Sequence, residues 1–241
     1  MPNLADNGCE PALRRPGIMV LVGTFLAPVT QVLLLFATAG TVSIPRAWLY
    51  LVVGLTGIFG GTVLVARANP ELVNLRGEWK KRKDIRPWDK RLLIVYALFG
   101  FYVPPAIMGL DVGRYHWSSL GPWSVVAGTA LFCLGSVLIT WAMLVNTHFE
   151  VTVRIQSDRG HRIISTGPYA IIRHPGYLGA SLWALSTPLI IGSAFGLIPA
   201  AIAVAALVAR TFLEDRVLQA ELPTYAEYAR RVRYRLLPGI W

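Results

Sequence analysis

The sequence predicts an all-α integral membrane protein of about six transmembrane helices, and two observations predict it. Hydrophobic residues make up 54% of the 241-residue chain, only 15% of its residues are charged, and its mean hydropathy is +0.52. Soluble domains carry about 25% charged residues. The second observation is that long stretches contain no Asp, Glu, Lys, Arg or His. A stretch of roughly 20 apolar residues can cross a bilayer as a helix.

Four charge-free stretches have the length of one spanning helix: Gly17–Gly40, Ala47–Ala66, Leu92–Leu110 and Leu120–Val145. A fifth, Pro175–Ala209, is too long for one helix, because at 1.5 Å per residue it would far exceed a hydrocarbon core of about 30 Å. We therefore expect two short helices folded back on each other. Gly192, Ser193 and Gly196 supply the turn, and Pro188 can kink the first helix.

The basic residues orient the predicted helices. Of 23 Lys and Arg residues, 21 fall before the first span, in the loops 67–91 and 146–174, or after residue 209. Only Arg46 and Arg114 fall in the alternate connections. The positive-inside rule then places both termini and both basic loops in the cytoplasm. The apolar run after Arg15 is longer than a signal-peptide core, so we expect an uncleaved first span.

The net charge of +10 and the pI of about 10.1 do not indicate a nucleic-acid partner. A nucleic-acid binder needs a basic groove on a soluble fold. Here the cations flank membrane spans, where they orient the protein and contact anionic lipid. We therefore expect the bilayer as a partner and no nucleic acid. Cys9 and Cys133 lack metal-ligand spacing, so we expect no metal site.

The first four spans, residues 1–145, have the features of a scaffold. Gly57 and Gly61 form a GxxxG pair that lets helices approach closely, and Pro104-Pro105 is expected to bend the third span. The loop 67–91 is the most basic part of the chain. We expect it to lie on lipid headgroups. The alternative is a lid or a guide for an amphipathic substrate.

The sequence changes character after Val145, and residues 146–241 form a second predicted part. Polar residues now alternate with Gly and Pro, and both Gly167-Pro168 and His174-Pro175-Gly176 interrupt any helix. The segment between must be irregular or a short helix at the cytoplasmic membrane face. Irregular backbone at that depth needs a cavity or a ligand for its polar groups. This segment therefore predicts a polar ligand site beneath apolar helices.

The end of the last span supplies a counterpart to that site. Arg210 and Glu214 are four residues apart and share one helix face, either as a local salt bridge or as part of a site. Beyond them we expect a short helix with Tyr225 and Tyr228 on one face. The tail 234–241 is too apolar to float in water, so it is expected to dock back and close the site.

In this order, the motif pieces resemble the isoprenylcysteine carboxyl methyltransferase family, whose superfamily includes the membrane phospholipid methyltransferases. The resemblance covers about residues 146–241. The pieces are Gly160-His161, Gly167-Pro168-Tyr169, Arg173-His174-Pro175-Gly176-Tyr177, Arg210, Glu214, Tyr225, Tyr228 and the run from Tyr234 to Pro238.

The resemblance implies a methyltransferase that uses S-adenosylmethionine at the cytoplasmic face without a soluble Rossmann domain. It implies that Arg210 and Glu214 are catalytic and that Arg210 faces the methyl acceptor. By position it assigns cofactor contacts to Gln156, His161, Arg162, Ile163, Ile164, Tyr169, His174, Pro175, Gly176, Tyr177 and Glu214.

The chemistry of these side chains agrees with those roles. Tyrosine rings can face a sulfonium cation or adenine, and Glu214 can pair with an amine. The acceptor stays open between a lipidic or isoprenoid carboxylate, a thiol and an amine headgroup. A carboxylate can pair with Arg210. A thiol or amine would need a base, for which Glu214, Glu150 and His148 are candidates.

Two other functions are weighed against methyl transfer. Membrane sterol reductases end in similar Arg-His and Tyr-Arg-Leu-Pro patterns and use NADPH, but Gly167-Pro168-Tyr169 favours the methyltransferase. The third interpretation is a non-catalytic transport or assembly protein. A transporter is disfavoured because no ionisable residue lies in mid-span and no inverted repeat is visible.

Overall fold

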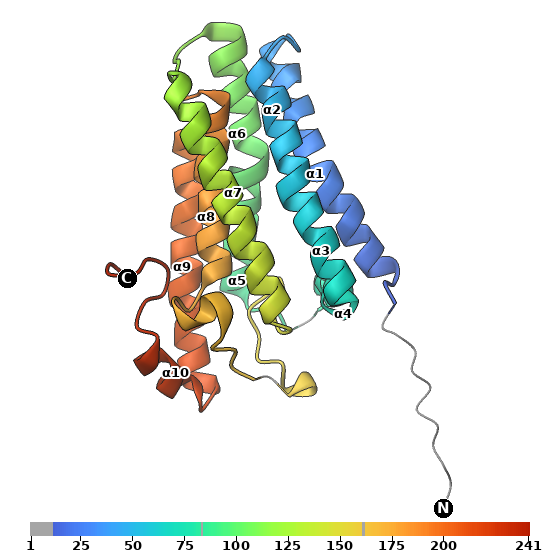
Figure 1. Cartoon of the computed structure of the whole chain (residues 1–241), viewed down its shortest axis with the longest axis vertical. Coiled ribbons are helices and arrows are strands. Elements are labelled where there is room, and N and C mark those ends of the chain that lie inside the picture. The colour runs from blue at the N-terminus through green and yellow to red at the C-terminus, as the bar shows by residue number, and fades with distance from the viewer. Residues whose placement is uncertain (1–11, 83, 161) are drawn as a thin grey trace, which may run out of the picture.

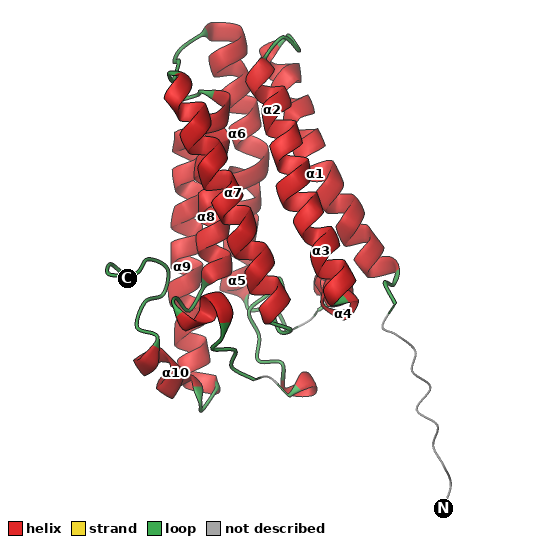
Figure 2. Cartoon of the chain, viewed as in Figure 1, coloured by secondary structure: helices red, strands yellow, loops and turns green. Residues whose placement is uncertain are grey.

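The computed structural model describes residues 12–82, 84–160 and 162–241, and within these residues it contains helices and loops but no strands (Figure 2). The predicted all-α class is confirmed. In Figure 1 the long helices run along one axis, and α4 (Pro70–Gly77) and α10 (Tyr225–Arg231) lie at the same end of the bundle.

Among the described residues, five helical stretches are long and apolar enough to cross a membrane. Three are the single helices α1 (Arg15–Ala39), α7 (Pro122–Val145) and α9 (Leu197–Glu221). The stretch Pro45–Ala68 consists of α2 (Pro45–Gly54), η1 (Leu55–Phe59) and α3 (Gly60–Ala68), and the stretch Pro87–Tyr115 consists of α5 (Pro87–Ala97) followed by η3, α6 and η4. Five helices begin with a proline, whose missing N–H costs nothing at a first helical position: Pro45, Pro70, Pro87, Pro122 and Pro175.

The predicted division of the long charge-free run is confirmed. α8 (Pro175–Ile191) and α9 are separate helices, and Gly192 ends α8 with a φ of 92°, a left-handed conformation that glycine adopts readily. α8 has 17 residues, fewer than a perpendicular span needs. Six crossings therefore stay a prediction.

The third span contains two π-helical segments, η3 (Leu98–Tyr102) and η4 (Gly109–Tyr115), around α6 (Val103–Met108). Pro104 and Pro105 lack N–H donors, so carbonyls one turn earlier lose their helical partners. The Phe101 carbonyl instead accepts a 3.2 Å hydrogen bond from the Gln31 side chain of α1. The bend expected at Pro104-Pro105 stays a prediction, and what the structure shows there is a π-helical segment on each side of α6.

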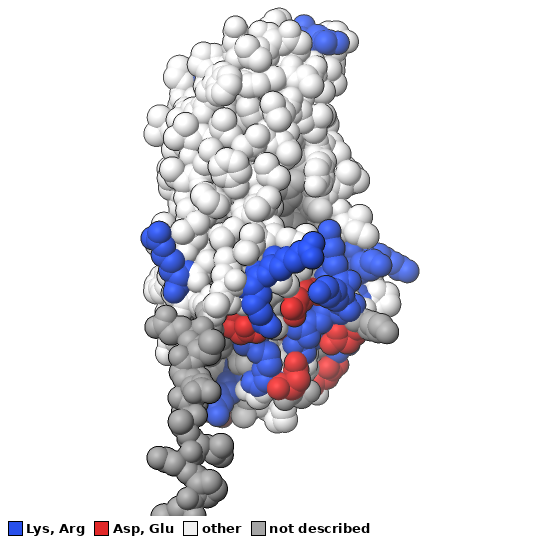
Figure 3. Space-filling view, turned by 90° about the vertical axis from the view of Figure 1, so that its right-hand side faces the viewer, with Lys and Arg blue, Asp and Glu red and all other residues white. Residues whose placement is uncertain are grey.

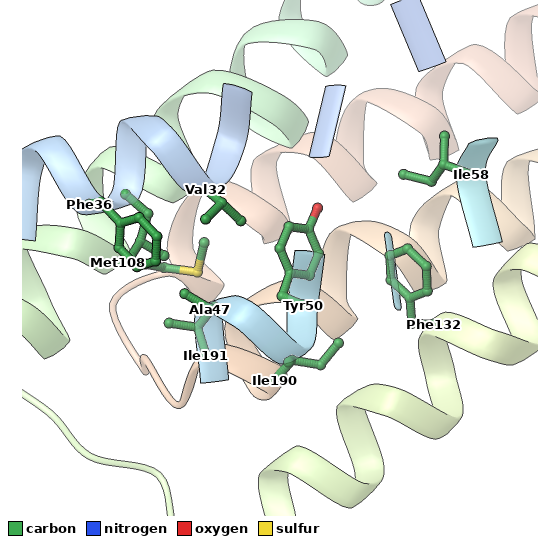
Figure 4. Packing of buried hydrophobic residues seen from close by; sticks show 10 residues of the cluster. Val32, Phe36, Ala47, Tyr50, Ile58, Met108, Phe132, Ile190 and Ile191 are labelled. Carbon is green, nitrogen blue, oxygen red and sulfur yellow. The ribbon is translucent and has the colours of Figure 1, made fainter. Parts of the chain in front are cut away.

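The core lies between α1, α2, α7 and α8, where Tyr50 and Phe132 pack among aliphatic side chains (Figure 4). Glycines bring η1 and α3 close to α7, as the GxxxG pair predicts. A Cβ on Gly57 would lie 2.4 Å from Ser136 Oγ, and one on Gly61 would lie 2.5 Å from Thr140 Oγ1.

Charged side chains gather at one end of the bundle, and the middle is almost bare of them (Figure 3). That end carries α4, the motif segment 146–177 and the end of α9. Of the Lys and Arg residues only Arg46 and Arg114 lie in the opposite connections, together with Asp111. The polar segments from the two predicted parts of the chain therefore meet at one end.

Candidate functional site

The motif segment is irregular, as predicted, apart from two 3₁₀ turns, η5 (Ser157–Arg159) and η6 (Gly167–Ala170). The C-terminal tail holds its far end in place. The backbone amides of Arg173 and His174 donate to the carbonyls of Tyr234 and Arg235, both at 3.0 Å. The predicted docking of the tail is confirmed, but the tail braces the segment from outside. The residues that line the cavity described below end at Tyr228.

Asp215 anchors this arrangement from α9. Its carboxylate is fully buried. Arg173 Nε lies 3.0 Å from it, Arg235 Nε 2.9 Å and the Tyr225 hydroxyl 2.8 Å. One buried acid thereby joins α9, the motif segment, α10 and the tail. Sequence reasoning missed Asp215, although it adjoins Glu214.

A cavity of about 480 Å³ lies between the motif segment and the helices. Its polar wall includes Asn146, His148, Gln156, Tyr169, His174, Tyr177, Arg210 and Glu214. Its apolar wall draws on α1, α5, η3, α7, α8 and α9: Val20, Ala27, Leu93, Phe101, Met143, Trp183 and Leu207. Both predicted parts of the chain thus contribute to one cavity.

The structure brings together ten of the twelve predicted site residues around this cavity. They are Gln156, Arg162, Ile163, Ile164, Tyr169, His174, Gly176, Tyr177, Arg210 and Glu214. Pro175 is buried beside them as the first residue of α8. His161 lies outside the described residues.

Arg210 is buried and paired, but not with Glu214. Its Nε donates to Asp89 at 2.7 Å, its Nη2 donates to the Val151 carbonyl, and its guanidinium carbon lies 5.2 Å from the Tyr177 ring centroid. The local Arg210–Glu214 salt bridge considered from the sequence is therefore not formed. Asp89 is the counter-ion that sequence reasoning missed. The one sign of it in the sequence is that Asp89 is an acid among the cations of the basic loop 67–91, in the first turn of α5.

Glu214 faces the cavity and accepts a hydrogen bond from the Tyr177 hydroxyl. The Tyr177 ring stacks on the His174 ring with centroids 5.7 Å apart and planes 15° from parallel. Among the described residues, Glu214 has no basic side-chain nitrogen within 4.0 Å. Within the described residues its carboxylate therefore forms no ion pair, although the charge of Arg210 acts on it at longer range.

Three polar pairs shape the rest of the wall. The Asn146 amide donates to the Tyr169 hydroxyl at 3.1 Å, and the Tyr228 hydroxyl donates to the Tyr169 carbonyl at 2.7 Å. Burial raises the pKa of Tyr169 well above its ordinary value, so the side chain is a neutral phenol. His148 Nδ1 lies 3.1 Å from Gln156 Oε1.

Glu150 forms ion pairs with three neighbouring arginines. It receives bonds of 2.9 and 3.0 Å from Arg154, and Arg82 and Arg159 lie 3.4 and 3.8 Å from its oxygens. Because the oxygens of Glu150 already bind these arginines, Glu150 is not free to approach an acceptor as a base. Arg82 also ties the basic loop 67–91 to the motif segment, so this loop does more than lie on headgroups.

A model of the isoprenylcysteine carboxyl methyltransferase family matches residues 128–221. The match starts earlier than the predicted resemblance, inside α7, and ends before α10. It therefore includes the motif segment, α8 and α9, which carry Tyr177, Arg210 and Glu214.

Three relatives are similar over overlapping stretches. The chain is 30% identical to a protein-S-isoprenylcysteine O-methyltransferase of Schizosaccharomyces pombe over 37% of this chain and 35% of the relative. It is 28% identical to protein-S-isoprenylcysteine O-methyltransferase B of Arabidopsis thaliana, over 49% and 59%. The third, from Saccharomyces cerevisiae, is 31% identical over 44% and 43%.

The chain thus spans between about a third and three-fifths of the length of these relatives. All three are named as methyltransferases, so they support neither the reductase nor the non-catalytic interpretation. Together with the apolar helices, the matches identify an integral membrane protein. The predicted resemblance is confirmed: residues 128–221 are similar to the isoprenylcysteine carboxyl methyltransferase family.

Proposed function

We propose that this chain is an S-adenosylmethionine-dependent methyltransferase that esterifies the carboxylate of a lipophilic, isoprenylcysteine-type acceptor at the cytoplasmic membrane face. The observation that carries the proposal is that one cavity has both a polar wall from the motif segment and an apolar wall from the spans. Such a cavity suits two reactants of unlike polarity.

The polar wall has the chemistry that S-adenosylmethionine requires. Glu214 offers an unpaired anion to a cationic group, and the stacked rings of Tyr177 and His174 offer aromatic surface. Gln156 and Tyr169 add hydrogen-bonding groups. When bound, the cofactor supplies a methyl group on a sulfonium; an acceptor oxygen bonds this carbon while the carbon–sulfur bond breaks and its electron pair stays on sulfur.

The apolar wall has the chemistry of a lipid tail. Val20 and Ala27 of α1 face the same cavity as Leu93 of α5 and Trp183 of α8. An isoprenoid chain that comes from the bilayer exchanges one apolar surrounding for another here, so the wall can accept it without burying polar groups against it. The names of the relatives point to the same acceptor class.

Arg210 favours a carboxylate over a thiol or an amine. Asp89 and the Val151 carbonyl occupy two of its five N–H donors, and others stay available to an anion in the cavity. A carboxylate is already deprotonated at neutral pH, so its esterification needs no base. Glu150, a base candidate from the sequence, is committed to arginines. Alignment and exclusion of water are then the chief contributions of the protein.

The test uses the full chain in lipid nanodiscs with methyl-labelled S-adenosylmethionine and N-acetyl-S-farnesylcysteine. We expect label in a product that releases methanol in base, as a methyl ester does. A base-stable labelled product would redirect the proposal to a thiol or an amine. Stabilisation by NADPH, with neither methyl transfer nor binding of S-adenosylhomocysteine, would replace it by the reductase.

A further inference from the structure

Arg76 is a cavity-lining cation that comes from outside the matched family segment. It lies near the end of α4, in the basic loop, and its Nη1 donates to the Phe149 carbonyl at 3.0 Å. Its guanidinium carbon lies 5.4 Å from the centroid of the Phe149 ring. Gly176 lets that ring pack closely, because a Cβ there would lie 2.3 Å from Phe149 Cζ.

The position of Arg76 is built into the fold. Asn69 caps α4 by accepting from the Leu72 amide at 3.0 Å. The Asn74 side chain accepts from the Arg14 amide at 2.8 Å, which ties α4 to the start of α1. A Cβ on Gly77 would lie 2.2 Å from the Pro16 carbonyl oxygen, so the two helices meet at van der Waals distance.

Arg76 differs from its neighbours in having no ion-pair partner among the described residues. Arg210 pairs with Asp89 at 2.7 Å, Arg173 with Asp215 at 3.0 Å and Arg154 with Glu150 at 2.9 Å. No carboxylate oxygen of the described residues lies within 4.0 Å of the Arg76 side chain. Arg162 also lines the cavity without such a partner, but it is exposed and water can solvate it.

The surroundings of Arg76 favour an anion. Burial, followed by the nearby charge of Arg210, lowers the pKa of Arg76 to about 10, so it stays a cation at neutral pH. Tyr177, Glu150 and Tyr169 also act on it, in the opposite direction. Arg76 is half-buried, with its remaining surface on the cavity, and withdrawing a cation even partly from water is costly unless an opposite charge pairs with it.

Arg76 and Arg210 both donate hydrogen bonds to backbone carbonyls in the same stretch of the motif segment. Arg76 donates to the Phe149 carbonyl and Arg210 to the Val151 carbonyl, which is two residues further on. Two residues of chain span at most about 7 Å. Val73, on the same helix as Arg76, packs with Met143 in the apolar wall. Arg76 therefore stands where the apolar wall meets the polar one.

We propose that Arg76, together with Arg210, flanks the carboxylate of the acceptor and makes this enzyme selective for anionic acceptors. The inference rests on the proposed function and deepens it. An acceptor with its tail against α1 and α7 would present its anionic end between these two guanidinium groups. The alternative is that Arg76 binds the carboxylate of the cofactor, and the test distinguishes the two carboxylates.

The test compares two ligands, N-acetyl-S-farnesylcysteine and its neutral carboxamide, on the full chain in nanodiscs. Arg76→Gln keeps a donor for the Phe149 carbonyl but removes the charge, and Arg76→Lys keeps the charge. Arg67→Gln is the matched control, since Arg67 is an exposed cation of the same basic loop that does not line this cavity. Binding is measured by tryptophan fluorescence, and KM and kcat by methyl transfer.

We expect Arg76→Gln to weaken carboxylate binding and raise KM by about 10- to 100-fold, the effect of losing a charge-assisted hydrogen bond. Carboxamide and S-adenosylhomocysteine affinities should stay unchanged, Arg76→Lys should keep most of the preference, and Arg67→Gln should behave as wild type.

Three results would overturn the inference. An unchanged preference for carboxylate over carboxamide in Arg76→Gln would remove the proposed role. A loss confined to S-adenosylhomocysteine would assign Arg76 to the cofactor. If Arg76→Gln and Arg76→Lys both weakened the binding of every ligand equally, the role of Arg76 would be purely structural. Absence of methyl transfer by the wild type would instead contradict the proposed function, while the binding comparison still decides the role of Arg76.

Discussion

Glu214 and Asp215 are adjacent acids on α9 with different surroundings. Asp215 is fully buried among arginines and a tyrosine, whereas Glu214 faces the cavity and has only the Tyr177 hydroxyl as a hydrogen-bond partner among the described residues. Neighbouring helix positions point about 100° apart, so two consecutive acids readily serve two different neighbourhoods. Asp215 is suited to holding the site together and Glu214 to binding a cation.

Glu214→Gln should abolish a charge interaction with the cofactor and leave the fold intact. We expect S-adenosylhomocysteine affinity to fall by about 10-fold or more, because a charge-assisted hydrogen bond contributes roughly 1.5–3 kcal/mol. Isothermal titration calorimetry in detergent measures the change. Glu221→Gln, on the exposed end of the same helix and paired with Arg86, is the control and should bind normally. Equal affinities for wild type and Glu214→Gln would remove Glu214 from the cofactor site.

Asp215→Ala should destabilise the protein strongly. It leaves Arg173 buried without its carboxylate, and breaking a buried pair from one side costs about 3–5 kcal/mol. Unfolding by SDS in mixed micelles measures the loss. Asp158→Ala breaks the exposed pair of Asp158 with Arg154, and surface pairs contribute only about 0–1 kcal/mol. Similar losses in the two variants would show that Asp215 is not the anchor inferred from its contacts.

At the scale of elements, the sequence predicts what depends on local composition. The hairpin of α8 and α9 follows from a charge-free run that is too long for one helix and has turn residues near its middle. The irregular motif segment follows from its Gly-Pro interruptions. Both are properties of neighbouring residues, so a single sequence suffices for them.

Contacts between residues far apart in the sequence could not be predicted from local composition. Asp89 and Arg210 are 121 positions apart, and no periodicity links them. Arg76 lies in a loop whose many cations equally fit a surface on lipid headgroups, so nothing local separates the one that enters the cavity. Two acids near each other in sequence, Glu214 and Asp215, likewise gave no sign of which one is buried.

Gly135→Ala should weaken the contact between α7 and α8. A Cβ on Gly135 would lie 2.7 Å from the Gly179 carbonyl oxygen, and backbone cannot rotate away as a side chain can. Overpacking of this kind costs about 1–3 kcal/mol. SDS unfolding measures it against Gly60→Ala, whose Cβ would meet only the Leu55 carbonyl oxygen at 3.9 Å. A Gly135→Ala protein as stable as Gly60→Ala would mean that the two helices can separate without cost.

At the scale of the whole molecule, the one-sided charge and the cavity belong to one arrangement. The charged end holds the polar wall of the cavity, and the bare middle of the bundle surrounds the apolar wall (Figure 3). A lipid acceptor can reach the apolar wall from the bilayer, and a water-borne cofactor can reach the polar wall from the charged end. The proposed function, with S-adenosylmethionine supplied from the cytoplasm, therefore requires that the charged end faces inward.

Cysteine labelling in intact cells tests that orientation. In a background without Cys9 and Cys133, we place single cysteines at two exposed positions at opposite ends, Ser43→Cys and Lys80→Cys. The positive-inside rule predicts that a membrane-impermeant maleimide reacts with the first in intact cells and with the second only after permeabilisation. The reverse pattern would place the cavity on the outer side, away from the cofactor supply. It would contradict the cytoplasmic site while leaving the fold and the family match untouched.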